Sequence, residues 1–101
     1  MSKEQIKKTL FDAMKKSKFR NSIEKVSLFG SCTREGENKE SDIDVLIEFK
    51  SDAKIGLFEF ARLQRMLGKS VGKKVDLLTA ESISKFFRDK VLKEAEIIYE
   101  R

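Results

Sequence analysis

The segment that most restricts the possible fold is DIDVLIEF, residues 42–49, in which apolar side chains alternate with others. Successive side chains of a β-strand point to opposite sides, so such a segment has one apolar side. That side carries Ile43, Val45, Ile47 and Phe49. The opposite side begins with two carboxylates, Asp42 and Asp44. We therefore expect a buried strand whose first residues present two carboxylates on the same side.

The rest of the chain predicts helices and strands around this segment. Ser2 and Gln5 form a capping box for a first helix, and Thr79 caps a last one. We expect helices at 2–16, 56–67 (ended by Gly68) and 80–94, strands at 24–29, 42–49, 74–78 and 97–99, and a helical turn and loop at 32–41. This order predicts a small α/β (α+β) domain with a mixed sheet covered by helices. A chain of 101 residues fits one domain, residues 1–101.

Composition excludes several classes of site and location. The chain has no histidine and one cysteine, Cys32, so zinc sites and Ser-His-Asp or Cys-His hydrolases are excluded. A single cysteine also excludes an internal disulfide and indicates a reducing cytoplasm. No apolar run approaches the ~20 residues of a membrane span, and the first residues do not resemble a signal peptide. Catalysis would have to use carboxylates, lysines, hydroxyls or a hard metal ion.

The positive charge is concentrated at the N-terminus. The chain has 22 basic and 17 acidic side chains, a net charge of +5, and residues 1–25 alone hold eight basic against three acidic groups. This excess could attract an acidic partner or nucleic acid. We prefer the solvated face of an amphipathic helix. Nucleic acid is disfavoured because only Phe11 and Phe19 could stack on bases there.

Three aspartates suggest a metal site. Asp42 and Asp44 lie two positions apart on a strand, so their carboxylates reach one place and repel each other. A divalent cation removes this conflict, and oxygen ligands select Mg²⁺ or Mn²⁺. Asp76 lies inside another apolar strand and could join the pair if the two strands are adjacent. Three converging carboxylates would make a two-metal site reasonable.

Gly30 and Ser31 follow the first predicted strand. Glycine allows the backbone to approach a ligand closely, and the first amides of a following turn point toward an anion. A phosphate beside a magnesium-binding carboxylate pair suggests a nucleoside triphosphate substrate. A Gly-Ser pair alone is usually a structural turn. The functional prediction therefore depends on the combination of this pair with the aspartates.

That joint pattern resembles a known signature. Gly30-Ser31, ten residues, then Asp42 and Asp44 match GSx₁₀DxD of the nucleotidyltransferase superfamily that includes DNA polymerase beta. Residues 20–101 resemble the minimal nucleotidyltransferase (MNT) subfamily in particular. The resemblance implies a mixed-sheet nucleotidyltransferase fold. It also implies that Gly30 and Ser31 bind the triphosphate, and that Asp42, Asp44 and Asp76 bind the metals and catalyse transfer. We assign Arg34 to steadying the triphosphate.

Free-standing domains of this size are similar to antitoxins encoded beside HEPN-domain RNase toxins. The resemblance therefore implies a metal-dependent adenylyltransferase that moves AMP from ATP to a tyrosine hydroxyl of a HEPN-type toxin. The alternative is a catalytically weak antitoxin that neutralises its partner by contact. An unused acidic trio would destabilise the fold by repulsion, which favours the enzyme. A nucleotidyltransferase for small molecules is disfavoured, because such enzymes need a further substrate domain.

Overall fold

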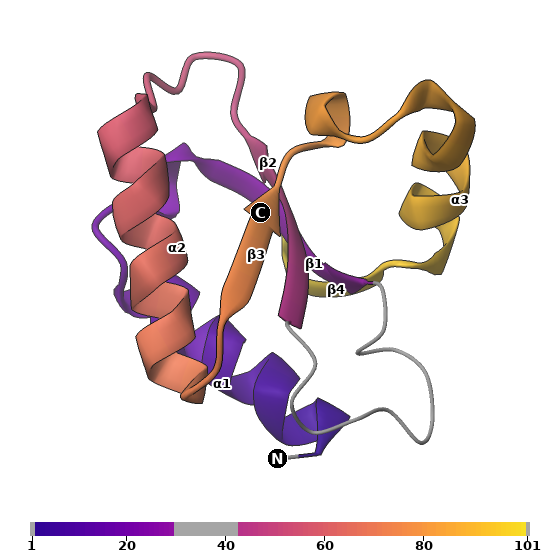
Figure 1. Ribbon diagram of the computed structural model, residues 1–101. Coiled ribbons are helices and arrows are strands. Elements are labelled where there is room, and N and C mark those ends of the chain that lie inside the picture. The colour runs from indigo at the N-terminus through magenta and orange to yellow at the C-terminus, as the bar shows by residue number, and fades with distance from the viewer. Residues whose placement is uncertain (1, 30–42, 101) are drawn as a thin grey trace.

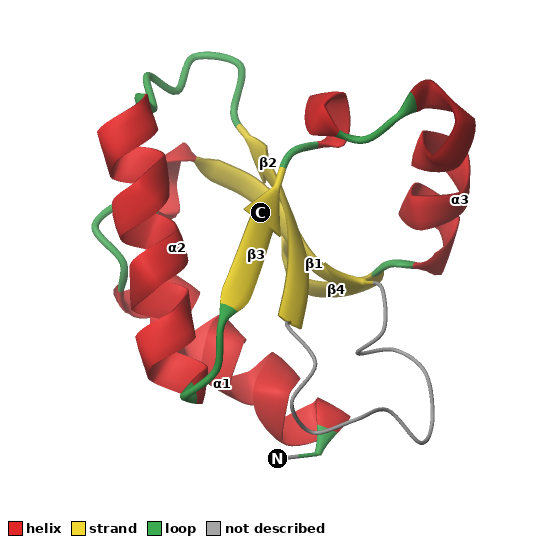
Figure 2. Cartoon of the chain, viewed as in Figure 1, coloured by secondary structure: helices red, strands yellow, loops and turns green. Residues whose placement is uncertain are grey.

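The computed structural model describes residues 2–29 and 43–100. It contains a four-stranded sheet with the order β3-β2-β1-β4. The central strands are β1 (Ile23–Phe29) and β2 (Ile43–Phe49), which pair antiparallel. The edge strands are β3 (Val75–Leu78), parallel to β2, and β4 (Glu96–Glu100), antiparallel to β1. The expected mixed sheet is thus confirmed, including the short C-terminal edge strand (Figure 2).

Two helices cover one side of the sheet. Helices α1 (Lys3–Lys16) and α2 (Leu57–Val71) pack against each other on the left of the sheet in Figure 1, and a short 3-10 helix, η1 (Arg20–Ser22), leads from α1 into β1. The core lies between these helices and the sheet. It contains Ile6, Leu10, Met14, Ile23, Val26, Leu28, Ile43, Val45, Ile47, Leu63, Leu67, Val71, Val75, Leu77 and Ile98. The apolar side predicted for residues 42–49 therefore faces this core.

The start of α1 follows the expected capping box. The backbone N–H of Gln5 donates to Ser2 Oγ (3.2 Å), and the backbone N–H of Ser2 donates to Gln5 Oε1 (2.9 Å). These reciprocal bonds satisfy two backbone donors that the first helical turn leaves without partners. The prediction of the helix beginning at Ser2 is confirmed.

The end of α2 differs from the prediction. Gly68 lies inside the helix, which continues to Val71 and ends at Gly72 with a left-handed φ of 69°. The reason is packing, because both Leu67 and Val71 are buried in the core. A Cβ on Gly68 would lie 3.1 Å from the carbonyl oxygen of Lys73. Gly68 is therefore suited to a close approach of the backbone, whereas Gly72 supplies the turn.

The helix predicted at 80–94 is divided. A 3-10 turn, η3 (Ala80–Ser82), is followed by extended backbone at Ile83 and then by α3 (Lys85–Glu94). Thr79 makes no side-chain cap, and the helix begins at Ser84, whose Oγ accepts from the backbone N–H of Phe86 (3.4 Å). Arg88 holds the break in place: its Nε donates to the Ala80 carbonyl (2.8 Å) and its Nη2 to the Ile83 carbonyl (3.1 Å).

Helix α3 lies on the side of the sheet opposite α1 and α2 (Figure 1). The four-residue spacing of Phe87 and Val91 in the sequence predicts one inward face for this helix, but no side chain of α3 is buried within the described part of the chain. In residues 2–29 and 43–100, no helix has both the length and the apolar character needed to cross a membrane.

Candidate functional site

The two sides of the sheet differ in character. The side toward α1 and α2 is apolar, as described above. We call the opposite side the second face. Since side chains alternate along each strand and directly paired residues point to the same side, the second face carries Ser27, Phe29, Asp44, Leu46, Asp76, Leu78 and Ile97. It is the only side of the sheet on which described acidic residues of β2 and β3 meet.

Asp44 and Asp76 are direct neighbours on this second face. The parallel pairing of β2 with β3 places Asp44 opposite Asp76 and Ile43 opposite Val75. Adjacent strands are about 4.8 Å apart, and both side chains leave the sheet on the same side. Both residues are half-buried. The sequence left open whether these two strands are adjacent; the structure shows that they are, so the two carboxylates converge.

Two hydrogen bonds hold the strand that carries Asp76. The backbone N–H of Ile43 donates to the Lys74 carbonyl (3.0 Å), which fixes the start of β3 against β2. On the other edge of β3, the backbone N–H of Leu77 donates to Gln64 Oε1 of α2 (3.0 Å). Gln64 therefore replaces the strand partner that an edge strand lacks.

The chain leaves β1 beside the carboxylates. Phe29, the last residue of β1, is paired with Asp44. Gly30 and Ser31 follow it in the sequence, but they lie outside the described residues, as do Arg34 and Asp42. Within the described residues, no three His, Cys, Asp or Glu side chains form a group that could hold a metal ion. Of the predicted site, the structure therefore describes the Asp44–Asp76 pair.

The donor set of this pair fits a hard cation. Carboxylate oxygens are the ligands that Mg²⁺ and Mn²⁺ prefer, and a bound cation would offset the repulsion between two acids on paired strands. Other oxygen ligands of Mg²⁺ are usually water and substrate phosphates. Two protein carboxylates can therefore begin such a site, provided that a phosphate completes it.

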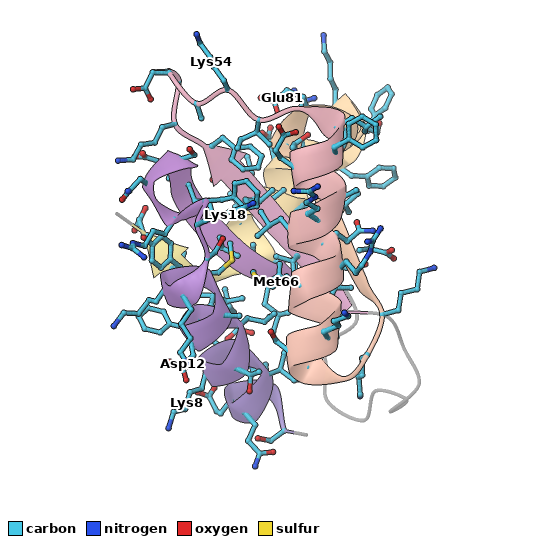
Figure 3. The ribbon with its side chains drawn as sticks, turned by 90° about the vertical axis from the view of Figure 1, so that its left-hand side faces the viewer. Lys8, Asp12, Lys18, Lys54, Met66 and Glu81 are labelled. Carbon is cyan, nitrogen blue, oxygen red and sulfur yellow. The ribbon has the colours of Figure 1, made fainter. Side chains whose placement is uncertain are left out.

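Some of the basic side chains near the N-terminus make contacts within the chain. Lys3 Nζ lies 3.1 Å and Lys7 Nζ 3.7 Å from the carboxylate of Glu96 on β4, and Lys15 Nζ lies 5.4 Å from the centre of the Phe11 ring. Figure 3 shows Lys8, by contrast, pointing away from α1. These contacts agree with the interpretation of α1 as a charged amphipathic helix. These contacts do not involve the Asp44–Asp76 pair, because α1 lies on the other side of the sheet.

Helix α2 carries a second basic surface, which the sequence analysis did not identify. A hollow of about 460 Å³ on α2 is lined by Arg62, Arg65, Met66, Lys69 and Ser70. The spacing of three and four residues between the basic side chains places them on one helical face, and this spacing is visible in the sequence. The hollow lies on the α2 side of the sheet and does not belong to the carboxylate site.

Comparison with known proteins matches nearly the whole chain to one protein family. Residues 4–101 match the family described as polymerase beta, nucleotidyltransferase. A candidate protein adenylyltransferase of Methanocaldococcus jannaschii is 35% identical over 95 residues, which are 94% of each chain.

Two solved structures show the same arrangement of strands and helices. The structure of a candidate minimal nucleotidyltransferase superposes with a TM-score of 0.74 at 28% identity and covers 94% of each chain. The MNT antitoxin in complex with the tri-AMPylated HEPN toxin of Shewanella oneidensis gives a TM-score of 0.68 at 16% identity, over 98% of this chain and 73% of the other. This second likeness concerns the fold.

Proposed function

This chain belongs to the polymerase beta nucleotidyltransferase family, and we propose that it transfers AMP from ATP to a hydroxyl group of a partner protein. The observation that carries the proposal is the in-register pair Asp44–Asp76, two carboxylates converging on one face of a sheet of this family. The resemblance to a candidate protein adenylyltransferase, 35% identical over 94% of this chain, supports AMP as the group and protein as the acceptor.

We further propose that the partner is a HEPN-type toxin and that the chain acts as its antitoxin. The support is the shared fold with an MNT antitoxin that was solved together with an AMPylated HEPN toxin. The acceptor would be a tyrosine, whose hydroxyl can reach a site at a sheet surface. The one domain, residues 1–101, would do this in the cytoplasm, where ATP is available and Cys32 stays reduced.

Each residue of the proposed site has a distinct role. Gly30 and Ser31 bind the triphosphate through backbone N–H groups and a hydroxyl, and Arg34 neutralises its charge. Mg²⁺ or Mn²⁺, when bound by Asp42, Asp44 and Asp76, would offset the negative charge on the phosphate oxygens. Strands β2 and β3 fix Asp44 and Asp76 in the sheet, so these two carboxylates need little rearrangement when the substrate arrives.

The reaction forms one bond and breaks one. The acceptor oxygen attacks the α-phosphorus in line, the bond between that phosphorus and the bridging α–β oxygen breaks, and pyrophosphate leaves. The proton of the acceptor hydroxyl passes to a carboxylate oxygen of Asp76, which we place nearest the acceptor. Asp42 and Asp44 then hold the nucleotide side of the site.

The test is transfer of label from ATP to the toxin. Wild-type protein, a HEPN-domain toxin encoded beside it and ATP labelled at the α-phosphate are incubated with Mg²⁺ or with EDTA. We expect labelled toxin with Mg²⁺ only, and none with the double variant Asp42→Asn, Asp44→Asn. The matched control is Asp52→Asn, which removes an exposed carboxylate in a turn. A toxin that loses its RNase activity without any label would instead establish the contact-only antitoxin.

A further inference from the structure

Helix α3 exposes more apolar surface than a helix of a small protein normally does. Phe86 is 93% exposed and Phe87 62%, and Leu92 is also exposed. Single exposed apolar residues are ordinary, but three on one ten-residue helix, two of them aromatic, are not. Burying them would remove a large apolar area from water, and no described part of this chain does so.

The directions of these side chains show that the sheet could not cover them. At 100° per residue, Phe86, Phe87 and Leu92 are spread over about 220° of the helix circumference. A helix that packs only on its own sheet needs one apolar stripe of about 100°. Cover for all three side chains must therefore come from a surface that surrounds α3 on several sides, such as a groove.

The helix is held rigidly although it is not buried. The Arg88 guanidinium donates to the carbonyls of Ala80 (2.8 Å), Ile83 (3.1 Å) and Glu81 (3.5 Å), and Ser84 caps the first turn. These bonds fix α3 to the segment of η3 and Ile83 before any partner arrives. A preorganised helix loses less conformational entropy on binding, which suits a docking element.

One more exposed apolar side chain lies on the second face, in the strand that follows α3. Ile97 of β4, 47% exposed, follows α3 closely in the chain and pairs with Ser27 of β1. Ser27 pairs in turn with Leu46, which lies two residues after Asp44 on β2. Two strand spacings across and one repeat of two residues along the strand place Ile97 about 12 Å from Asp44. A protein covering α3 and Ile97 thus lies about 12 Å from Asp44, on the face that carries the carboxylates.

We propose that α3 and Ile97 form the docking surface for the protein acceptor, with α3 inserted into an apolar groove of that protein. The inference rests on the proposed function, which requires a protein to approach the second face. Four basic and two acidic side chains on α3 predict that acidic residues surround the groove. The same net positive charge disfavours a second copy of this chain, because two such helices would repel each other.

The test measures binding separately from transfer. The variant Phe86→Ser, Phe87→Ser keeps the fold, because both side chains are exposed. Its matched control is Leu57→Ser, Phe58→Ser at the start of α2, where two residues are equally exposed (82% and 81%) on the other side of the sheet. The dissociation constant for the HEPN-domain toxin is measured by titration calorimetry, and the binding of ATP with Mg²⁺ is measured for each variant.

We expect the α3 variant to bind the toxin at least tenfold more weakly and the α2 variant within twofold of wild type, with ATP binding unchanged in both. Equal weakening by both variants, or wild-type affinity in the α3 variant, would overturn the docking inference. So would vesicles of phosphatidylglycerol that bind wild type but not the α3 variant while toxin binding is unchanged. A wild type that binds the toxin through α3 but transfers no AMP would refute the proposed function alone.

Discussion

Replacing Asp76 with asparagine should make the metal-free protein more stable and the enzyme nearly inactive. Asp76 and Asp44 are paired directly across β2 and β3, and the strand spacing of about 4.8 Å gives an expected separation of about 5 Å for side chains that leave the sheet in parallel. Two unit charges at about 5 Å repel by about 0.8 kcal/mol in water and about 1.7 kcal/mol at an effective dielectric constant of 40. Both side chains are half-buried, so we expect a gain of about 1 kcal/mol in the free energy of unfolding.

The assay is calorimetric unfolding in EDTA and in Mg²⁺. For a domain of this size about 1 kcal/mol corresponds to a rise in Tm of about 4 °C or more. Added Mg²⁺ should stabilise wild type and leave the variant almost unchanged, because binding to the native state raises stability only where the site is intact. The rate of AMP transfer should fall by about a hundredfold or more, the typical cost of removing one preorganised electrostatic group.

The control is Asp52→Asn, which removes a carboxylate far from β3 and should change neither Tm nor transfer. A lower Tm for Asp76→Asn in EDTA would mean that the carboxylate makes a stabilising contact, and the reasoning from repulsion would be wrong. Full activity in the variant would remove Asp76 from the site.

Three further predictions concern the fold and the surface charge. Leu67→Ala should lower the free energy of unfolding by about 2–5 kcal/mol in urea titrations, because Leu67 is fully buried between α2 and the sheet. Gly72→Ala should cost about 1–2 kcal/mol by the same measurement, since φ of 69° strains any residue with a Cβ. Lys8→Glu with Lys16→Glu, both exposed on α1, should slow association with an acidic partner and leave dissociation nearly unchanged in surface plasmon resonance at low salt. Equal rates for wild type and this variant would mean that the lysines only keep the protein soluble.

Local patterns predicted the sheet and the first helix well. The alternation in residues 43–49 required a strand with one buried side, and Ser2 with Gln5 required a helix start, because both signals act within a few residues. The predictions failed where two local signals competed. Gly68 is a plausible helix end, but burial of Val71 extends α2 by another turn. Thr79 is a plausible cap, but Ser84 and the bonds of Arg88 begin α3 later.

The sequence by itself determined which kind of residue could act: with no histidine and one cysteine, carboxylates are the side chains left to hold a cation, and the alternation in residues 42–49 put Asp44 on the polar side of its strand. Whether Asp76 joins Asp44 was decided only by the tertiary structure. They are 32 positions apart in the chain, and their meeting depends on β2 and β3 pairing in one register around α2. A register shift of one residue would turn Asp76 into the core. The exposure of α3 was likewise decided by the tertiary structure, because the apolar residues of this helix do not show by themselves whether another element packs against them.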